Sequence, residues 1–102
     1  MNKVDFSVIV PVYRSVQTLE PLFDGIQSVM DELKSTFEVV FVEDSGEDPS
    51  WNELLRLKKI HGDSISCIRL SRNFGQNGAT LCGIDQANGR KVITIDDDLQ
   101  TS

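Results

Sequence analysis

The sequence predicts an α/β fold in which a mostly parallel sheet of four strands carries helices on both faces. Four short runs of the 102-residue chain are almost continuously apolar and rich in β-branched residues, which is typical of strands buried on both faces. Helical segments are expected between these runs. Strand and helix therefore alternate along the chain, and right-handed crossovers between parallel strands place helices on both faces.

The first strand is expected over residues 6–13, where Pro11 lacks an N–H and interrupts pairing near the carboxyl end. A helix follows, with Thr18 as its N-cap and Pro21 in its first turn, where a missing N–H does little harm. Apolar residues at helical spacing form one stripe along this helix, which we expect to pack on the sheet. The stripe consists of Leu19, Leu22, Phe23, Ile26, Val29, Met30 and Leu33.

The second strand, residues 37–42, leads into an acidic turn. Asp48 followed by Pro49 predicts the start of a second helix, which ends near His61-Gly62. His61 is the only histidine of the chain. We assign it to the last turn of this helix rather than to catalysis, because a ring is well tolerated at a helix end.

The second half of the chain continues the same alternation. A third strand is expected over residues 64–70, followed by a polar, glycine-bearing stretch over 71–78. A third helix is expected over residues 79–87, stopped by the Asn-Gly pair at 88–89. The last strand, residues 91–95, ends in three consecutive acids, Asp96-Asp97-Asp98, which we call the acid triplet.

Length and charge limit the class of protein. A chain of 102 residues with 39% hydrophobic residues is one domain or part of one. Its formal net charge of −6 makes nucleic acid a poor candidate partner. It contains no apolar run long enough to cross a membrane, and its two cysteines lack zinc-type spacing. We expect reduced thiols and a cytoplasmic protein.

Polar residues follow the predicted strands at the edge of the sheet where ligands bind in such folds. They are Tyr13-Arg14, Glu43-Asp44, Ser71-Arg72-Asn73 and the acid triplet. Asp96 and Asp98 share a face in extended chain and form an Asp-x-Asp pair. Carboxylates repel a nucleotide diphosphate, but Mg²⁺ or Mn²⁺ between them reverses the sign of the interaction. The alternative is a solvated acidic turn.

Two other residues at this edge suit a nucleotide, since Asp44 can accept a hydrogen bond from a base or ribose and Tyr13 offers a ring for stacking. The dinucleotide fingerprint and the phosphate-binding P-loop are both absent. Gly75, Gly78 and Gly83 have the wrong spacing for either motif, and the P-loop lysine is missing. The dehydrogenase and P-loop kinase readings are therefore disfavoured.

The chain resembles the amino-terminal part of family-2 glycosyltransferases, which have the Rossmann-like GT-A fold. It looks closest to the branch that transfers sugars to dolichyl or polyprenyl phosphate. The resemblance covers nearly all 102 residues. It rests on Ser7-Val8-Ile9-Val10-Pro11-Val12-Tyr13, Phe41-Val42-Glu43-Asp44, Leu70-Ser71-Arg72-Asn73-Phe74-Gly75 and Asp96-Asp97-Asp98-Leu99-Gln100.

The resemblance implies a metal-dependent transferase that uses a nucleoside-diphosphate sugar, usually with inversion, and a polyprenyl-phosphate or glycan acceptor. By the family pattern Asp98 is the metal ligand, Gln100 supports the metal site, and Asp96 lies near the ribose or diphosphate. The carboxylates Asp96 and Asp98 are thereby the candidate catalytic residues, and Mg²⁺ or Mn²⁺ is the implied cofactor.

The nucleotide pocket implied by the family consists of Pro11, Tyr13 and Asp44, with Asp44 recognising the base. Arg72 and Asn73 mark the family's loop; Arg72 either balances the diphosphate charge or is solvated.

The sequence departs from the family in three places. Arg14-Ser15 replaces the common Asn-Glu, and Glu43-Asp44-Ser45-Gly46 replaces Asp-Asp-Gly-Ser. Asp97 stands where a small or neutral residue is usual.

The family's acceptor site and catalytic base come from sequence after the Asp-x-Asp pair. We therefore expect residues 1–102 to be the donor-binding part of a longer glycosyltransferase domain, which by itself binds donor with little or no transfer. Membrane association is expected only through further sequence or a lipid-linked acceptor, at the inner face of the membrane. The alternatives are a non-enzymatic α/β module that binds metal or nucleotide, a nucleotidyltransferase, or a remnant that binds nothing.

Overall fold

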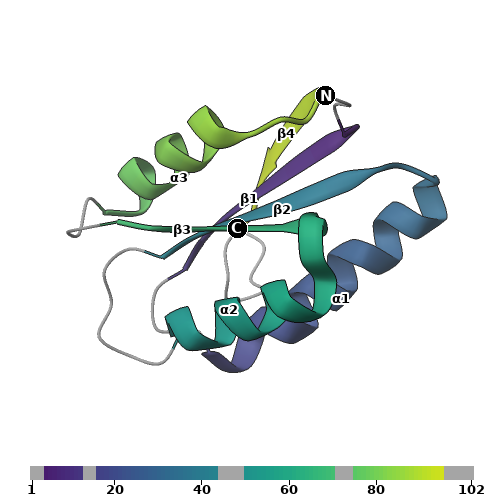
Figure 1. The fold of residues 1–102 in the computed structure, drawn as a ribbon. Coiled ribbons are helices and arrows are strands. Elements are labelled where there is room, and N and C mark those ends of the chain that lie inside the picture. Colours follow the sequence, from purple (N-terminus) through teal and green to yellow (C-terminus); the bar gives the residue numbers. More distant parts are fainter. Residues whose placement is uncertain (1–3, 13–15, 44–49, 71–74, 96–102) are drawn as a thin grey trace.

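The structure is a computed structural model that describes residues 4–12, 16–43, 50–70 and 75–95. Strands and helices alternate along these residues (Figure 1). The elements are β1 (Phe6–Val12), α1 (Val16–Leu33), β2 (Phe37–Glu43), α2 (Ser50–His61), the 3₁₀ helix η1 (Gly62–Ser64), β3 (Ile65–Arg69), α3 (Gly75–Gln86) and β4 (Lys91–Thr94).

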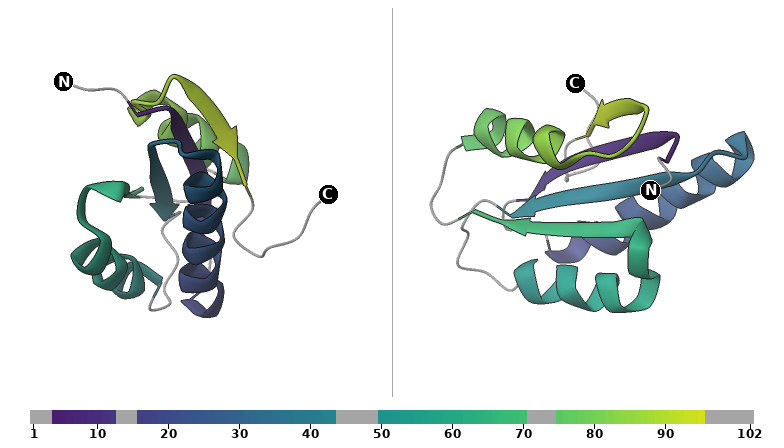
Figure 2. Two further views of the ribbon diagram at one scale, coloured as in Figure 1. Left: turned by 90° about the vertical axis from the view of Figure 1, so that its right-hand side faces the viewer. Right: turned by 45° about the horizontal axis from the view of Figure 1, so that its top comes forward.

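The four described strands form one sheet in the order β3-β2-β1-β4, and every pair in it is parallel. Figures 1 and 2 show α1 and α2 on one face of the sheet and α3 on the other. The predicted fold class, a parallel α/β sheet with helices on both faces, is confirmed. No helix among the described residues is long and apolar enough to span a bilayer.

Alternation along the strands divides the core between the two faces. In β1, Val8, Val10 and Val12 belong to a larger buried cluster that includes side chains of α1 and α2. Ile9 points the other way, into a smaller cluster with Val40, Val42 and Ala79. Each strand of the centre is thus buried on both faces, as its continuous apolar run predicts.

Pro11 ends the pairing of β1 on one side only. The N–H of Ile95 donates to the carbonyl of Ile9 at 3.0 Å, so the backbone polar groups of Ile9 face β4. Residues two apart in a strand face the same neighbour, and Pro11 therefore turns its missing N–H toward β4. Pairing with β4 stops at Ile9, whereas pairing with β2 continues through Pro11 to Val12.

The first helix begins earlier than predicted. It starts at Val16, so Thr18 is not its N-cap and Pro21 lies within the helix. Pro21 is exposed. The stripe is buried at five positions, but Val29 and Leu33 are 53% and 57% exposed, because no described element covers that end of α1.

The third helix also begins earlier, at Gly75 instead of residue 79, so part of the expected polar loop is helical. It ends at Gln86, but Gly89 does not cap it with a left-handed conformation, because Gly62 is the only described glycine with a positive φ. A Cβ on Gly89 would lie 2.4 Å from the Ser7 nitrogen. Glycine is needed there for close approach to β1.

A buried polar network seats β4 at the amino-terminal edge of the sheet. The Ser7 hydroxyl donates to Glu38 Oε2 at 2.5 Å, and the backbone N–H of Asn88 donates to the same oxygen at 2.6 Å. The N–H of Gly89 donates to Ser7 Oγ at 2.6 Å. Glu38 is only 6% exposed, so these donors compensate its burial. The network joins β1, β2 and the connection from α3 to β4.

Candidate functional site at the carboxyl edge of the sheet

The strand order creates a topological switch point between β1 and β4. From β1 the chain moves to β2 and β3 in one direction, and then crosses by α3 to place β4 on the other side of β1. In open parallel sheets ligands bind outside the carboxyl ends of the strands at such a point. Among the described residues the pairing of β1 with β4 ends at Ile9, and β1 continues to Val12.

Of the predicted site residues, the structure describes Pro11. It lies in β1, one residue before the strand ends, opposite Val42 of β2. The other predicted residues lie outside the described residues. They are Tyr13, Asp44, Arg72, Asn73, Asp96, Asp98 and Gln100.

The described strand ends lie next to these residues in the chain. Val12 ends β1 directly before Tyr13, and Glu43 ends β2 directly before Asp44. Ile95 directly precedes Asp96 in the chain, and the hydrogen bond from its N–H to Ile9 holds Ile95 beside β1. The described strands that precede the predicted segments therefore end at one edge of the sheet, with β1 and β4 as neighbours.

Glu43 is an acid at this edge whose burial the sequence pattern did not indicate. It was expected in the acidic turn after a strand over 37–42, but it is the last residue of β2 and 1% exposed. Its register partner is Arg69, the last residue of β3. Arg69 Nε lies 3.2 Å from Glu43 Oε2, an ion pair without hydrogen-bond alignment. Among the described residues, neither Glu43 carboxylate oxygen has a hydrogen-bond partner.

Arg69 also contacts the first turn of α2. Its guanidinium carbon lies 5.5 Å from the centre of the Trp51 ring, within cation–π range. The backbone extends the β2–β3 pairing by one residue, since the N–H of Leu70 donates to the Glu43 carbonyl at 3.0 Å. Glu43, Arg69 and Trp51 thus form one cluster at the carboxyl ends of β2 and β3. The alternation of side chains along β3 could have indicated this cluster, because Arg69 lies on the same face of the strand as the inward-facing Ile65 and Cys67.

His61 packs as a helix-end residue, as expected. Its ring centre lies 4.2 Å from that of Phe23 in α1. This contact joins the end of α2 to α1, away from the carboxyl edge.

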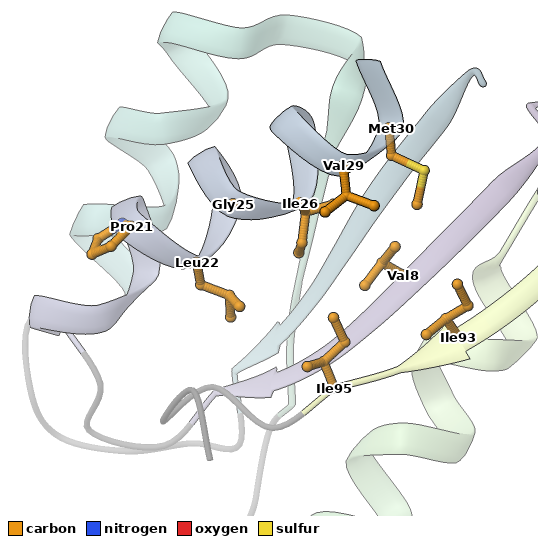
Figure 3. A pocket seen from close by; sticks show the side chains of 9 residues that line it. All are labelled: Val8, Pro21, Leu22, Gly25, Ile26, Val29, Met30, Ile93 and Ile95. Atoms are coloured by element: carbon orange, nitrogen blue, oxygen red, sulfur yellow. The ribbon is translucent and has the colours of Figure 1, made fainter. Parts of the chain in front are cut away.

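A separate hollow of about 280 Å³ lies between α1 and the β1–β4 side of the sheet (Figure 3). Side chains of α1 such as Ile26 and Met30 face Val8, Ile93 and Ile95 across it. Every lining residue is apolar or glycine, so the hollow offers no polar group to orient an anionic nucleotide. Within the described part of the chain there is also no group of three potential metal ligands. The predicted ligands lie outside it.

Comparison with known proteins identifies a family. A family model described as glycosyl transferase family 2 matches residues 7–102. An uncharacterized glycosyltransferase of Bacillus subtilis, YkcC, is 35% identical over 97 residues, which are 95% of this chain and 30% of the relative. The undecaprenyl-phosphate 4-deoxy-4-formamido-L-arabinose transferase of Aeromonas hydrophila is 33% identical over 103 residues, 98% of this chain and 32% of the relative. The chain thus spans roughly a third of these relatives.

Solved glycosyltransferases share the fold. A mannosyltransferase from Pyrobaculum calidifontis in complex with GDP-Man and Mn²⁺ superimposes with a TM-score of 0.79 at 24% identity, over 96% of this chain and 28% of the other. S. aureus TarS in complex with UDP-GlcNAc gives a TM-score of 0.73 at 26% identity, over 92% of this chain and 26% of the other.

Proposed function

Because the chain belongs to glycosyl transferase family 2, we propose that its carboxyl edge binds the nucleoside-diphosphate sugar for a metal-dependent, inverting sugar transfer. The observation that carries this proposal is the switch point between β1 and β4. It brings β1, which contains Pro11 and precedes Tyr13 in the chain, beside β4, the strand before the acid triplet in the sequence. Solved relatives with nucleotide sugars bound support the ligand class.

Asp96, Asp98 and Gln100 would hold Mg²⁺ or Mn²⁺, since carboxylate and amide oxygens are the ligands these hard cations prefer. The complex of the Pyrobaculum enzyme with Mn²⁺ supports this choice. When bound, the cation supplies Lewis-acid stabilisation of the departing diphosphate. Asp98 is the principal ligand in this proposal, and Asp96 lies toward the ribose or diphosphate.

The nucleoside would be held by residues of the neighbouring strand ends. Asp44 accepts a hydrogen bond from the base, while Pro11 and Tyr13 form the wall of its pocket. Arg72 offsets diphosphate charge, and Asn73 belongs to the same loop. These assignments follow the family motif, and the parallel sheet supports them by directing β1, β2 and β3 to one edge.

A polyprenyl phosphate is the proposed acceptor for the whole enzyme, supported by the undecaprenyl-phosphate transferases among the relatives. A phosphate oxygen of the acceptor would attack the anomeric carbon, and the bond from that carbon to the diphosphate would break, with inversion. A lipid-linked acceptor places this reaction at the inner face of the membrane. For residues 1–102 we propose donor binding without turnover, because the chain covers only 32% of such a relative.

Calorimetric titration tests the donor site. The chain is titrated with UDP-, GDP- and dTDP-sugars with and without Mn²⁺, and one of them is expected to bind only with the metal. Asp98→Ala should weaken this binding by at least about tenfold. The matched control is Asp31→Ala, which removes an exposed carboxylate from the far end of α1 and should leave binding unchanged.

Two outcomes would contradict the proposal. Equal affinity with and without Mn²⁺ would exclude metal dependence, and no binding of any nucleotide sugar would exclude a donor site in this chain. Sugar transfer to a polyprenyl phosphate by residues 1–102 alone would contradict the restriction to donor binding.

A further inference from the structure

We propose that Arg69 is a positioning residue for donor binding, acting through the ends of the chain segment that contains Asp44. The inference rests on the proposed function. The guanidinium of Arg69 pairs with Glu43 and lies over the Trp51 ring. It thereby fixes the points at which the chain leaves β2 and enters α2. Arg69 need not touch the nucleotide to do this.

Arg69 contacts both ends of that segment. Glu43 is the last residue before residue 44, and Trp51 is the second residue of the helix that follows residue 49. The guanidinium lies 3.2 Å from the Glu43 carboxylate by Nε and 5.5 Å from the Trp51 ring centre. A shift of either end would break one of these two contacts.

The two ends are also anchored in the core. Glu43 is 1% exposed, and its carbonyl accepts the N–H of Leu70. At the other end Ser50 is fully buried, and Trp51 packs against the larger cluster. Arg69 itself is 52% exposed at its side chain. The guanidinium therefore joins two anchored points across an open edge.

The chemistry of the cluster favours a positional role over a stabilising one. Burying a carboxylate is costly, and a buried ion pair is often no more stable than apolar residues of the same volume. Among the described residues Glu43 has no hydrogen-bond partner to offset this cost, and Arg69 is the cation that pairs with it. A carboxylate buried in this way is better explained by the residues that its ion pair positions than by a gain in stability.

Arginine suits this position better than lysine. The planar guanidinium can present an edge to a carboxylate and a face to an aromatic ring at the same time. The lysine ammonium keeps the charge opposite Glu43, but as a point charge it cannot serve both contacts in one plane. Arg69→Lys therefore separates geometry from charge, and it does not leave Glu43 buried without a cation.

Trp51 gives the experiment a direct readout, because it is the only tryptophan of the chain. Acrylamide quenching of its fluorescence reports loss of the Arg69 contact. Affinity is measured for UDP, GDP and dTDP with Mn²⁺, and urea unfolding shows that each variant is folded. We expect Arg69→Lys to make Trp51 more accessible and to weaken binding of the preferred nucleotide about fivefold.

Arg56→Lys is the matched control. Arg56 lies on the same helix as Trp51 and pairs with Glu53 and Glu20, but it does not belong to the cluster. This variant should bind the nucleotide as the wild type does. If Arg69→Lys unfolds, the double variant Glu43→Gln with Arg69→Gln removes both charges together, and the same loss of affinity is expected.

The possible failures differ. A wild-type chain that binds none of the three nucleotides overturns the proposed function and this inference with it. If the wild-type chain binds a nucleotide and Arg69→Lys binds it as tightly, although Trp51 has become more accessible, the inference alone is overturned. An Arg56→Lys variant that weakens binding as much as Arg69→Lys also overturns it, because the effect would then be one of general surface charge.

Discussion

At the scale of single residues, Cys67 shows how burial alters a side chain's chemistry. It lies in β3, half-buried, and its Sγ donates to the Leu54 carbonyl at 3.7 Å. Burial raises the pKa of the Cys67 thiol, because the thiolate would lose hydration, and the Lys58 ammonium only partly offsets this. The raised pKa favours the folded state while the thiol is neutral. That contribution falls as the pH rises above the pKa of an exposed thiol.

We predict that Cys67 is alkylated with a pH profile displaced to higher pH than that of the unfolded chain. The measurement uses the Cys82→Ser variant, in which Cys67 is the only thiol, and compares iodoacetamide rates in buffer and in urea. The thiolate is the reacting form, so its late appearance delays the reaction. A folded-state profile at the same or lower pH would contradict the prediction.

The residues of the site differ in how far sequence could place them. The effect of Pro11 was predictable because it is local: a missing N–H interrupts strand pairing. The structure adds that the interrupted pairing is the one with β4. Glu43 was not, because its burial depends on Arg69, a residue of another strand. An acid before a second acid, a serine and a glycine has the pattern of a solvated turn, and only the register of β2 with β3 shows otherwise.

At the scale of elements, strands were predictable and helix starts were not. The four strands lie within the predicted runs to about one residue, because continuous apolar sequence leaves few alternatives. The starts of α1 and α3 were wrong. Gly75 and Gly78 are poor helix formers, but packing outweighs propensity here, since Ala79 is fully buried and Gly83 lies against Ile9.

Two glycines give opposite predictions for the same substitution. Gly25 lies inside α1, and a Cβ there would meet no atom within 4 Å. Gly25→Ala should raise the free energy of unfolding by about 0.5–1 kcal/mol, because alanine loses less backbone entropy in a helix. Gly62 has a φ of +65°. Gly62→Ala should lower the same quantity by about 1–2 kcal/mol, because the left-handed conformation crowds a Cβ.

Urea unfolding of both variants tests this pair. If both substitutions shift the urea midpoint in the same direction, the local backbone conformation does not determine the change in stability at one of the two glycines.

At the scale of the whole molecule, the two layers of the core are unequal. The larger cluster joins α1 and α2 to the sheet, while α3 is held by a smaller cluster of four buried residues, Ile9, Val40, Val42 and Ala79. Elements with few buried contacts open first in native-state exchange. The sequence predicted helices on both faces but not this inequality, because it depends on the strand order, which places α3 over β1 and β2.

We predict that Gly83→Ala loosens α3 selectively. The new Cβ would lie 2.4 Å from Ile9 Cγ2 and 3.0 Å from Val42 Cγ2, and such overpacking costs about 1–3 kcal/mol. Hydrogen exchange should become faster at the amides of α3 and stay slow in β1 and β2. Gly25→Ala on the other face is the control and should leave α3 exchange unchanged. Faster exchange throughout the sheet would contradict a selective effect.

The pairing of the last strand with the first has a consequence for biosynthesis. Lys91 stands opposite Phe6 across the β1–β4 ladder, so this contact spans nearly the whole chain. A nascent chain that has emerged as far as α3 can already assemble β3-β2-β1, and it then presents β1 as an open edge. We expect β4, the last of the four described strands in chain order, to pair with that edge after the other three have assembled. Donor binding would then have to wait until β4 has paired with β1.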